Sequence, residues 1–492
     1  MLQFVLQNAE GLRRYCRPVA LLSSCAMSLL LGGCLVGKEK PDAGLDVPQV
    51  YATKVRNPDA ALPTPDWWRG FRDKQLTGLI EESLTSNLDV AVAIARIVQA
   101  DASARIAGAP LLPAVTGSAN YSRIRPSQTT GSSGNLSSSG ASERNSYSAS
   151  LSASYVLDFW GQNRAALLAA QETAVASRFD REVVALTTVV SVATAYFQVA
   201  AAQERLRVAR ENLAAAERVL KVIQDRVAVG TASALDLSQQ QSLVATQRAA
   251  IPPLIQTYRQ NIATLALLIG RPPVRVTVRS AGLFGLAIPP VTPGLPSDLL
   301  TRRPDIRETE AQLASTNASV ESARAAFFPT IQLTSQNGYQ SSILQNLVRP
   351  ESAFFNLAAG LTQPILDGYL LQGQFDLARG RQDEALQNYR KSVVSAFTDV
   401  EKALVAVQQT AEQERLQREV VRSSRQAFQI AEQRLREGTV DLVTVLQTQQ
   451  TLFQALDNLA QVRLARLLAV VSLFQALGGG WNPPVDEQLS NR

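Results

Sequence analysis

The segment SYSASLSASYVLDF, residues 146–159, alternates between two kinds of side chain. The apolar or aromatic set consists of Tyr147, Ala149, Leu151, Ala153, Tyr155 and Leu157, and the other set consists of Ser146, Ser148, Ser150, Ser152 and Ser154. Since successive side chains of a β-strand point to opposite faces, the segment predicts a strand with one apolar face and one hydroxyl-lined face. This pattern is typical of outer-membrane barrels, although a strand on a soluble sheet with one wet face has it too.

Three more segments have the character of strands, and a Ser/Gly-rich loop at 128–145 separates the first of them from the quoted segment. The four expected strands are at about 114–123, 146–158, 330–340 and 354–364. Four strands cannot close a barrel, because open edges are not tolerated in lipid and about eight strands is the minimum. The barrel must therefore be shared between copies. Two copies would give about eight strands and three about twelve, and the need for a lumen favours three.

After Trp160 the hydrophobic period changes from two residues to seven. Apolar residues recur at Val192, Val199, Leu206, Leu213, Leu220 and Val227. A second set lies three positions further on, at Ala195, Ala202, Ala209, Ala216 and Ile223. This seam predicts long helices that supercoil with a left-handed twist and, through the alanines, approach one another closely.

The second half of the chain repeats the first. The residues Val400, Val407, Val421, Phe428 and Leu435 stand 208 positions after their counterparts in the first seam, with Glu414 as the one interruption. The turn RVAVGTASALDLSQQQ (226–241) reappears as RLREGTVDLVTVLQTQQ (434–450), and AGAPLLP (107–113) as ARAAFFP (323–329). Such self-similarity indicates an internal duplication, in which each repeat reads helix, strand, loop, strand, long helix, turn and helix.

These patterns divide the chain into five segments. We expect a signal peptide at 1–33, an extended leader at 34–66, a first repeat at 67–279, a second repeat at 280–477 and a tail at 478–492. Besides a helix before the first strand, helices are expected at 160–229 and 233–269 in the first repeat and at 298–326, 369–437 and 440–477 in the second. Pro252 and Pro253 predict a kink, because proline removes a backbone donor.

The N-terminus has the layout of a secretory signal. Three arginines precede the apolar run VALLSSCAMSLLL (19–31), which is followed by LGGC. LGGC resembles the bacterial lipoprotein cleavage box, so Cys34 is predicted to be the lipidated first residue of the mature chain. The alternatives are LSSC, which ends at Cys25 and fits loosely, and a plain signal peptide with an unmodified cysteine. The residue after Cys34 is Leu35 and not Asp, and in this the chain resembles lipoproteins that are sorted to the outer membrane.

The composition excludes several kinds of chemistry. The chain has no His, and its three Cys all lie at or before Cys34, so a zinc, copper or haem site is not expected in the rest of the chain. No carboxylate pair stands out, and we predict neither an enzyme nor a cofactor nor a metal. The net charge of +6 is scattered without a Lys/Arg run, so no nucleic-acid partner is expected. No run of about 18 apolar residues follows the signal, so no membrane-spanning helix is predicted.

Four further segments resemble one family in their order and spacing. The most specific is GLPSDLLTRRPDIRETEAQLASTNASVESARAAFFPTIQL (294–333), supported by DWWRGFRDKQLTGLI (66–80), LDFWGQNR (157–164) and LIGRPP (268–273). Together they resemble the TolC-like outer-membrane efflux factors, in the NodT-type lipoprotein branch. The resemblance implies a mixed, mainly α fold with transmembrane β-strands. Four strands per chain would contribute to a trimeric twelve-stranded barrel, continued by a long α-helical periplasmic barrel of the coiled-coil type.

The resemblance also implies a function. The resemblance implies a homotrimer in the outer membrane of a Gram-negative bacterium, anchored in lipid at its N-terminus. This homotrimer would be a passive exit duct. It would receive drugs or other small toxic compounds from an inner-membrane pump, expected to be RND-type, through a periplasmic adaptor protein. One alternative is the duct of a type I protein secretion system. Another is a structural envelope lipoprotein with a solid coiled-coil stalk.

In this family the two helix–turn–helix tips dock the adaptor and form the aperture. The corresponding docking and turn residues are Arg226, Gly230, Thr231, Leu235, Arg434, Gly438, Thr439 and Leu446. Asp236 is an aperture candidate, because carboxylates from several copies can form a ring that attracts cations. Gln447 is the second aperture candidate, and it departs from the Asp that relatives often carry. The two glycines suit a left-handed helix end, and Thr231 or Ser233 can cap the returning helix.

Overall fold

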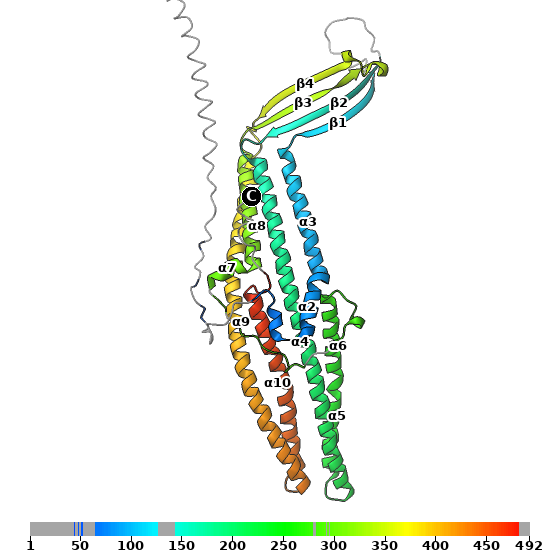
Figure 1. The fold of residues 1–492 in the computed structure, drawn as a ribbon, viewed down its shortest axis with the longest axis vertical. Coiled ribbons are helices and arrows are strands. Elements are labelled where there is room, and N and C mark those ends of the chain that lie inside the picture. Colours follow the sequence, from blue (N-terminus) through cyan, green and yellow to red (C-terminus); the bar gives the residue numbers. More distant parts are fainter. Residues whose placement is uncertain are drawn as a thin grey trace, which may run out of the picture. The chain divides into compact units, whose positions relative to one another are not determined.

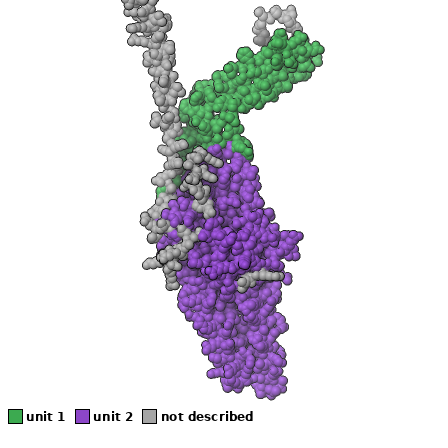
Figure 2. All heavy atoms as spheres, in the orientation of Figure 1, with its two compact units in different colours: residues 1–44, 105–169, 315–386 green, residues 45–104, 170–314, 387–492 purple. Residues whose placement is uncertain are grey.

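The computed structural model describes residues 44, 48, 51–52, 64–125, 143–278, 282–291, 293–294 and 296–481. The predicted signal peptide, Cys25 and Cys34, most of the leader and of the Ser/Gly-rich loop, and the end of the tail lie outside the described residues. The chain divides into two compact units (Figure 2). Apart from the first 44 residues, the strand unit contains 105–169 and 315–386, and the helical unit contains 45–104, 170–314 and 387–492.

The strand unit holds one antiparallel sheet in the order β1-β2-β3-β4 (Figure 1). Its strands are β1 (Ala114–Ile124), β2 (Arg144–Leu157), β3 (Thr330–Ser341) and β4 (Ala353–Thr362). The quoted segment is most of β2, and its alternation continues across the sheet: Ser150 lies opposite Ser118 of β1, and Leu157 lies opposite Ile331 of β3. The outer edges of β1 and β4 have no strand partner within the described residues.

The two faces of this sheet differ in chemistry. On the hydroxyl face the Ser118 and Ser150 hydroxyls lie 3.1 Å apart, and the Gln336 amide donates to the Ser150 hydroxyl at 3.2 Å. On the other face the rings of Tyr121 and Tyr147 stack with centroids 4.9 Å apart. The sheet therefore carries a polar, hydrogen-bonded side and an apolar side, as the alternation predicts.

The long helices are α4 (Gln162–Ala228) and α9 (Leu370–Glu437), and both run from the strand unit into the helical unit. The other helices are α2 (Lys74–Ser86), α3 (Leu88–Gly108), α5 (Ala234–Ala249), α6 (Ile251–Leu268), α7 (Leu299–Arg302), α8 (Pro304–Ala325) and α10 (Leu442–Ala476). Short 3₁₀ turns are η2 (Trp67–Phe71), η3 (Ala109–Leu111), η4 (Pro273–Arg275), η5 (Pro296–Asp298), η6 (Leu344–Asn346) and η7 (Pro350–Ser352).

Two of the expected helices are interrupted, and proline explains both breaks. The helix expected over 233–269 is two helices, α5 and α6, because Pro252 and Pro253 cannot donate backbone hydrogen bonds to the preceding turn. The helix expected over 298–326 is likewise split. Arg303 precedes Pro304 and takes an extended conformation (φ −92°, ψ 121°), which ends α7 before α8 begins.

The largest core of the helical unit gathers aromatic residues around α4. Trp67 stacks on Phe474 with centroids 4.7 Å apart, and Phe71 contacts Phe197 at 5.0 Å. The buried hydroxyl of Tyr196 donates to Asp73 at 2.9 Å. This core fixes the N-terminal segment, α4 and α10 relative to one another within the unit.

Two helices contain windows that are long and apolar enough to cross a membrane by length and composition alone, namely α4 and α10. The sequence predicts no such helix. Of these windows 61% and 56% are buried inside the protein. Their hydrophobicity is therefore accounted for by packing within the helical unit.

Candidate functional site

Two helix–turn–helix tips lie at the same end of the helical unit (Figure 1). The first tip joins α4 to α5, and the second joins α9 to α10. One apolar cluster belongs to both tips. Its buried members are Val219, Ile223, Phe428, Ala431, Leu435, Leu442, Val445 and Leu452, and Val227, Leu237, Val440, Leu446 and Leu456 pack against them. The structure thus brings the two predicted tips together in one chain.

The two turns have the same backbone. Gly230 and Gly438 have φ values of +74° and +77°, which favour glycine. The Thr231 N–H donates to the Arg226 carbonyl at 2.8 Å, and the Thr439 N–H donates to the Arg434 carbonyl at 2.9 Å. The two glycine N–H groups bond the carbonyls one residue later, at 3.0 Å in both turns. These are Schellman-type helix ends, so four of the predicted docking residues and both arginine carbonyls build the turns themselves.

The helices that return from the tips begin with side-chain caps. Ser233 caps α5, and the Asp236 carboxylate completes a capping box by accepting from the Ser233 N–H at 2.9 Å and its hydroxyl at 2.8 Å. Thr231 does not cap; its hydroxyl donates to the Arg226 carbonyl at 3.1 Å. The aperture candidate Asp236 therefore has a structural role at the start of α5.

At the second tip Asp441 takes the capping position, and it accepts from the Thr444 N–H at 3.0 Å. Hydrogen bonds from Thr444 hold the pKa of the Asp441 carboxyl below its usual value. The other aperture candidate, Gln447, is exposed on α10. Asp441 is not singled out in the sequence analysis, although an Asp just before an apolar helical pattern is a readable helix-start signal.

The predicted docking leucines differ in exposure. The Leu235 side chain is 66% exposed, whereas Leu446 packs against the apolar cluster of the tips. Val229, which the sequence reasoning missed, is 73% exposed on the other side of the same turn. Exposed apolar side chains flanking a rigid turn can contact a partner, and Leu235 and Val229 are better placed for this than Leu446.

One arginine crosses from the first tip to the second. The Arg226 guanidinium donates to the Leu435 carbonyl and lies 3.4 Å from the Arg436 carbonyl oxygen. A cation at these carbonyls is favourable, because the C-terminal end of a helix is its negative end. Arg434, which occupies the same position in the second tip, is exposed.

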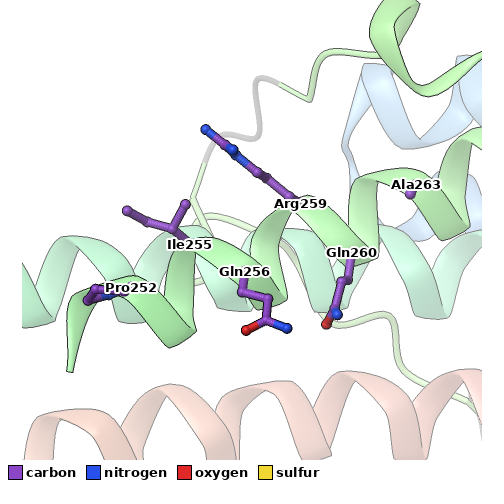
Figure 3. Close-up of a pocket in the computed structure, with 6 residues that line it drawn as sticks. All are labelled: Pro252, Ile255, Gln256, Arg259, Gln260 and Ala263. Atoms are coloured by element: carbon purple, nitrogen blue, oxygen red, sulfur yellow. The ribbon is translucent and has the colours of Figure 1, made fainter. Parts of the chain in front are cut away.

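Other concave regions offer less chemistry. A groove of about 460 Å³ runs along one helix, α6, and is lined by Pro252, Ile255, Gln256, Arg259, Gln260 and Ala263 (Figure 3). In Figure 3, Gln256 and Gln260 point to one side of the helix and Arg259 to another. Within the described part of the chain, no group of His, Cys, Asp or Glu could hold a metal ion.

Comparison with known proteins adds to this geometry. The sequence matches the family described as outer membrane efflux protein over residues 79–271 and 295–479. It is 40% identical to the pyoverdine export outer membrane protein OpmQ of Pseudomonas aeruginosa, over 94% of this chain and 97% of that protein. It is 33% identical to the toluene efflux pump outer membrane protein TtgC of Pseudomonas putida, over 94% of this chain and 96% of the relative.

Solved structures agree with the sequence relatives. The crystal structure of CusC, a protein described as forming a transmembrane channel, aligns with this chain with a TM-score of 0.80 at 28% identity. The alignment covers 91% of this chain and all of the CusC chain. The outer-membrane channel OprN aligns with a TM-score of 0.81 at 26% identity, over 90% of this chain and all of OprN.

Proposed function

We propose that this chain, which belongs to the outer membrane efflux protein family, assembles as a homotrimer whose two tips per subunit dock a periplasmic adaptor. The chain is the outer-membrane channel component of an efflux system, and the family and its relatives are channel proteins, not enzymes. The predicted fold class, with four transmembrane strands per chain continued by long helices, is confirmed by the solved channels.

The observation that carries the proposed assembly is the sheet with two unpaired edges. The outer edges of β1 and β4 have no strand partner in the described chain, and an unpaired edge is not tolerated in hydrocarbon. Pairing β4 of one copy with β1 of the next removes every edge. Three copies then give a barrel of about twelve strands, with the apolar face toward lipid and the hydroxyl face toward a wet lumen.

The exposed apolar residues Leu235 and Val229 support adaptor docking at the first tip. Exchanging Leu235 for Asp should abolish capture of the adaptor by the purified trimer, because a charge would have to be desolvated in the contact. Val274→Asp, at an exposed position outside the tips, is the matched control and should leave capture unchanged. Unaltered adaptor binding by Leu235→Asp would remove Leu235 from the docking surface.

Planar-bilayer recording tests the duct itself. The purified oligomer should conduct ions, whereas a solid coiled-coil stalk would give no conductance. Asp236→Arg should lower cation selectivity if Asp236 faces the aperture. Since this change also removes the capping box, Ser233→Ala serves as a control that disturbs the cap and keeps the Asp236 carboxylate. Selectivity of Asp236→Arg equal to that of Ser233→Ala would take Asp236 out of the aperture.

The N-terminal anchor is a separate proposal. Cys34, which follows the predicted cleavage box, would carry the lipid that tethers the chain to the outer membrane. Cys34→Ser should abolish incorporation of labelled palmitate, while Cys25→Ser should not. Loss of label in Cys25→Ser instead would move the lipidation site to the alternative box.

The cargo is proposed to be a small molecule delivered by an inner-membrane pump of the RND type. Relatives named for pyoverdine export are 40% and 41% identical to this chain, compared with 33% for a toluene efflux relative, which favours export of a pyoverdine-like compound over toxic solvents. A deletion strain should then lose pyoverdine from its medium. Retained pyoverdine with new drug or solvent sensitivity would favour the predicted toxic compounds, and loss of a secreted protein would favour type I secretion.

A further inference from the structure

The end of the sheet at which β1 and β3 end, here called the loop end, carries a band of tyrosines on its apolar face. The long helices join the sheet at its other end (Figure 1). Tyr121 and Tyr147 lie opposite each other in β1 and β2, and Tyr339 of β3 lies opposite Ala149, so all three tyrosines share the apolar face. In a membrane barrel, aromatic side chains gather where hydrocarbon meets the lipid headgroups. The loop end therefore has the character of a headgroup boundary.

Two arginines continue the apolar face beyond this band. Arg123 stands two residues after Tyr121 in β1, on the same face, and Arg125 follows the end of the strand. Their side chains are 63% and 68% exposed. Both approach a single carboxylate, that of Glu143. The Arg123 Nε–H donates to it at 2.9 Å, whereas Arg125 Nη1 and Glu143 Oε1 lie 3.9 Å apart. The donors of Arg125 are therefore largely available to a further anion.

The connection between β3 and β4 adds apolar side chains and another arginine at the loop end. Ile343, Leu344 and Val348 are 54%, 60% and 78% exposed. The neighbouring Arg349 is also exposed, and its side chain makes no hydrogen bond or ion pair with any described residue. Exposed apolar side chains beside a cation fit a surface at which acyl chains meet anionic headgroups.

The charge of the loop end is positive. The two segments that connect strands here, 122–146 and 342–352, contain four arginines and two glutamates, which leaves a net charge of +2 per chain. These residues are Arg123, Arg125, Arg144, Arg349, Glu143 and Glu351. An acidic protein would also suit this charge. Continuity with the apolar face of the sheet favours a lipid instead, because a lipid can contact the tyrosine band and the arginines together.

We propose that Arg125 and Arg349 bind phosphate groups of an anionic lipid in the outer leaflet, while Ile343, Leu344 and Val348 contact its acyl chains. A guanidinium presents two parallel N–H donors that match a phosphate, and such charged hydrogen bonds are strong. The inference rests on the proposed outer-membrane barrel, which places the apolar face of the sheet in lipid and the loop end at the outer surface.

Titration of the purified full-length oligomer with bisphosphorylated lipid A in a neutral detergent, followed by native mass spectrometry, tests the site. Arg125→Gln and Arg349→Gln should each weaken binding by about tenfold, because each removes charged hydrogen bonds to phosphate. Arg144→Gln is the matched control. Arg144 lies at the same end of the sheet, opposite Ile124 and on the hydroxyl face, so its loss should leave binding unchanged. Glu143→Gln should tighten binding, because it releases two arginines from a competing carboxylate.

Two further probes identify the source of the phosphate. Dephosphorylated lipid A should bind more weakly than the bisphosphorylated form, and inorganic phosphate should not displace the lipid. Equal binding of both lipids, or complete displacement by inorganic phosphate, would overturn the lipid site. Equal losses in Arg144→Gln and Arg125→Gln would also overturn it, since the attraction would then depend on total charge alone.

Planar-bilayer recording separates this inference from the proposed function. Every variant should still conduct ions, which shows that its barrel has formed. A wild-type protein that forms no conducting oligomer would contradict the proposed assembly itself. A conducting wild type that does not bind the phosphorylated lipid would overturn the lipid site and leave the duct in place.

Discussion

Glu308 in α8 is a carboxyl group that burial and the nearby charges of Asp180 and Asp305 make hard to ionise. Burial has the largest effect, and together these raise the pKa of Glu308 from 4.5 to about 7. A pKa that is higher in the folded state means that folding takes up a proton between these values. The stability that the fold has with Glu308 protonated is therefore fully present below about pH 4.5 and is lost as the pH rises through about 7.

We predict that Glu308→Gln removes this loss. The variant should be more stable than the wild type by about 1 kcal/mol above pH 7, a value reduced because Glu308 is only half-buried. Below pH 4.5 the two proteins should unfold at similar temperatures. Thermal unfolding followed by circular dichroism at both pH values measures this, and Glu310→Gln, at an exposed residue paired with Arg307, is the control. A pH-independent difference between Glu308→Gln and wild type would contradict the assignment.

The tip residues show what sequence can and cannot provide at this scale. Gly230 and Gly438 could be placed from the sequence, because a left-handed helix end demands glycine. Asp236 could be identified from the sequence as a candidate residue, but its capping role could not be predicted, since its hydrogen bond to Ser233 depends on the local backbone. The bond from Arg226 to the end of α9 joins residues about 209 positions apart and was outside the reach of any local pattern.

Among the elements, α9 carries a seam with one charged interruption. Glu414 stands where the first repeat has Leu206, and its side chain is 1% exposed. Three arginines surround it: Arg418 at 2.6 Å, Arg466 at 2.9 Å and Arg463 at 3.4 Å. Burial alone would raise the pKa of Glu414, but hydrogen bonds from Arg418 and Arg466 and the charge of Arg463 outweigh it and keep the pKa low.

This charged cluster predicts that restoring the apolar repeat of α9 at Glu414 will destabilise the protein. Glu414→Leu completes the apolar repeat but leaves Arg463 buried without its carboxylate partner, which should cost about 3–5 kcal/mol of stability. The double variant Glu414→Leu with Arg463→Met should recover most of this loss, because no buried charge remains. Urea unfolding of both variants and wild type measures the difference. A single variant as stable as wild type would show that Arg463 does not depend on Glu414.

The elements themselves followed from the sequence to different degrees. Period-two alternation in the quoted segment specifies β2, and the seven-residue seam specifies α4, since each period fits only one backbone geometry. The breaks within the helices were harder to predict from the sequence. Pro252 and Pro253 indicated a kink in one helix, and the structure has a break between α5 and α6, because whether a chain resumes its direction after proline depends on packing outside the helix.

At the scale of the whole molecule, the sequence predicts a barrel shared between copies but does not predict how the copies join. The structure supplies the missing rule through the duplication. Ala119 lies opposite Ala149 in the first repeat, and Ser335 lies opposite Leu357 in the second. The sequence repeats offset the segment before the first strand by 216 positions (323 − 107) and the tip turn by 208 (434 − 226), and the two pairings agree with these values, since 335 − 119 is 216 and 357 − 149 is 208.

Applied to the register of β2 and β3, these offsets predict the register between β4 of one copy and β1 of the next. Ser152 of β2 lies opposite Gln336 of β3. Adding 208 to 152 and subtracting 216 from 336 places Gly360 of one copy opposite Asn120 of the next. By the same rule Leu361 lies opposite Ala119, so residues of the apolar face meet residues of the apolar face, as a continuous barrel wall requires.

We predict that Gly360→Cys combined with Asn120→Cys forms a disulfide between copies under mild oxidation, seen as linked chains on a non-reducing gel. Directly opposite residues have Cβ atoms about 5 Å apart, and a Cβ at Gly360 has no atom of its own chain within 4 Å. Gly360→Cys with Ser122→Cys is the control, since that pair lies on the same face but diagonally, at about 7 Å. No native Cys follows Cys34, which leaves few competing thiols. Faster linking of the control pair would mean that the copies join in a different register, because a barrel edge cannot satisfy both pairings at once.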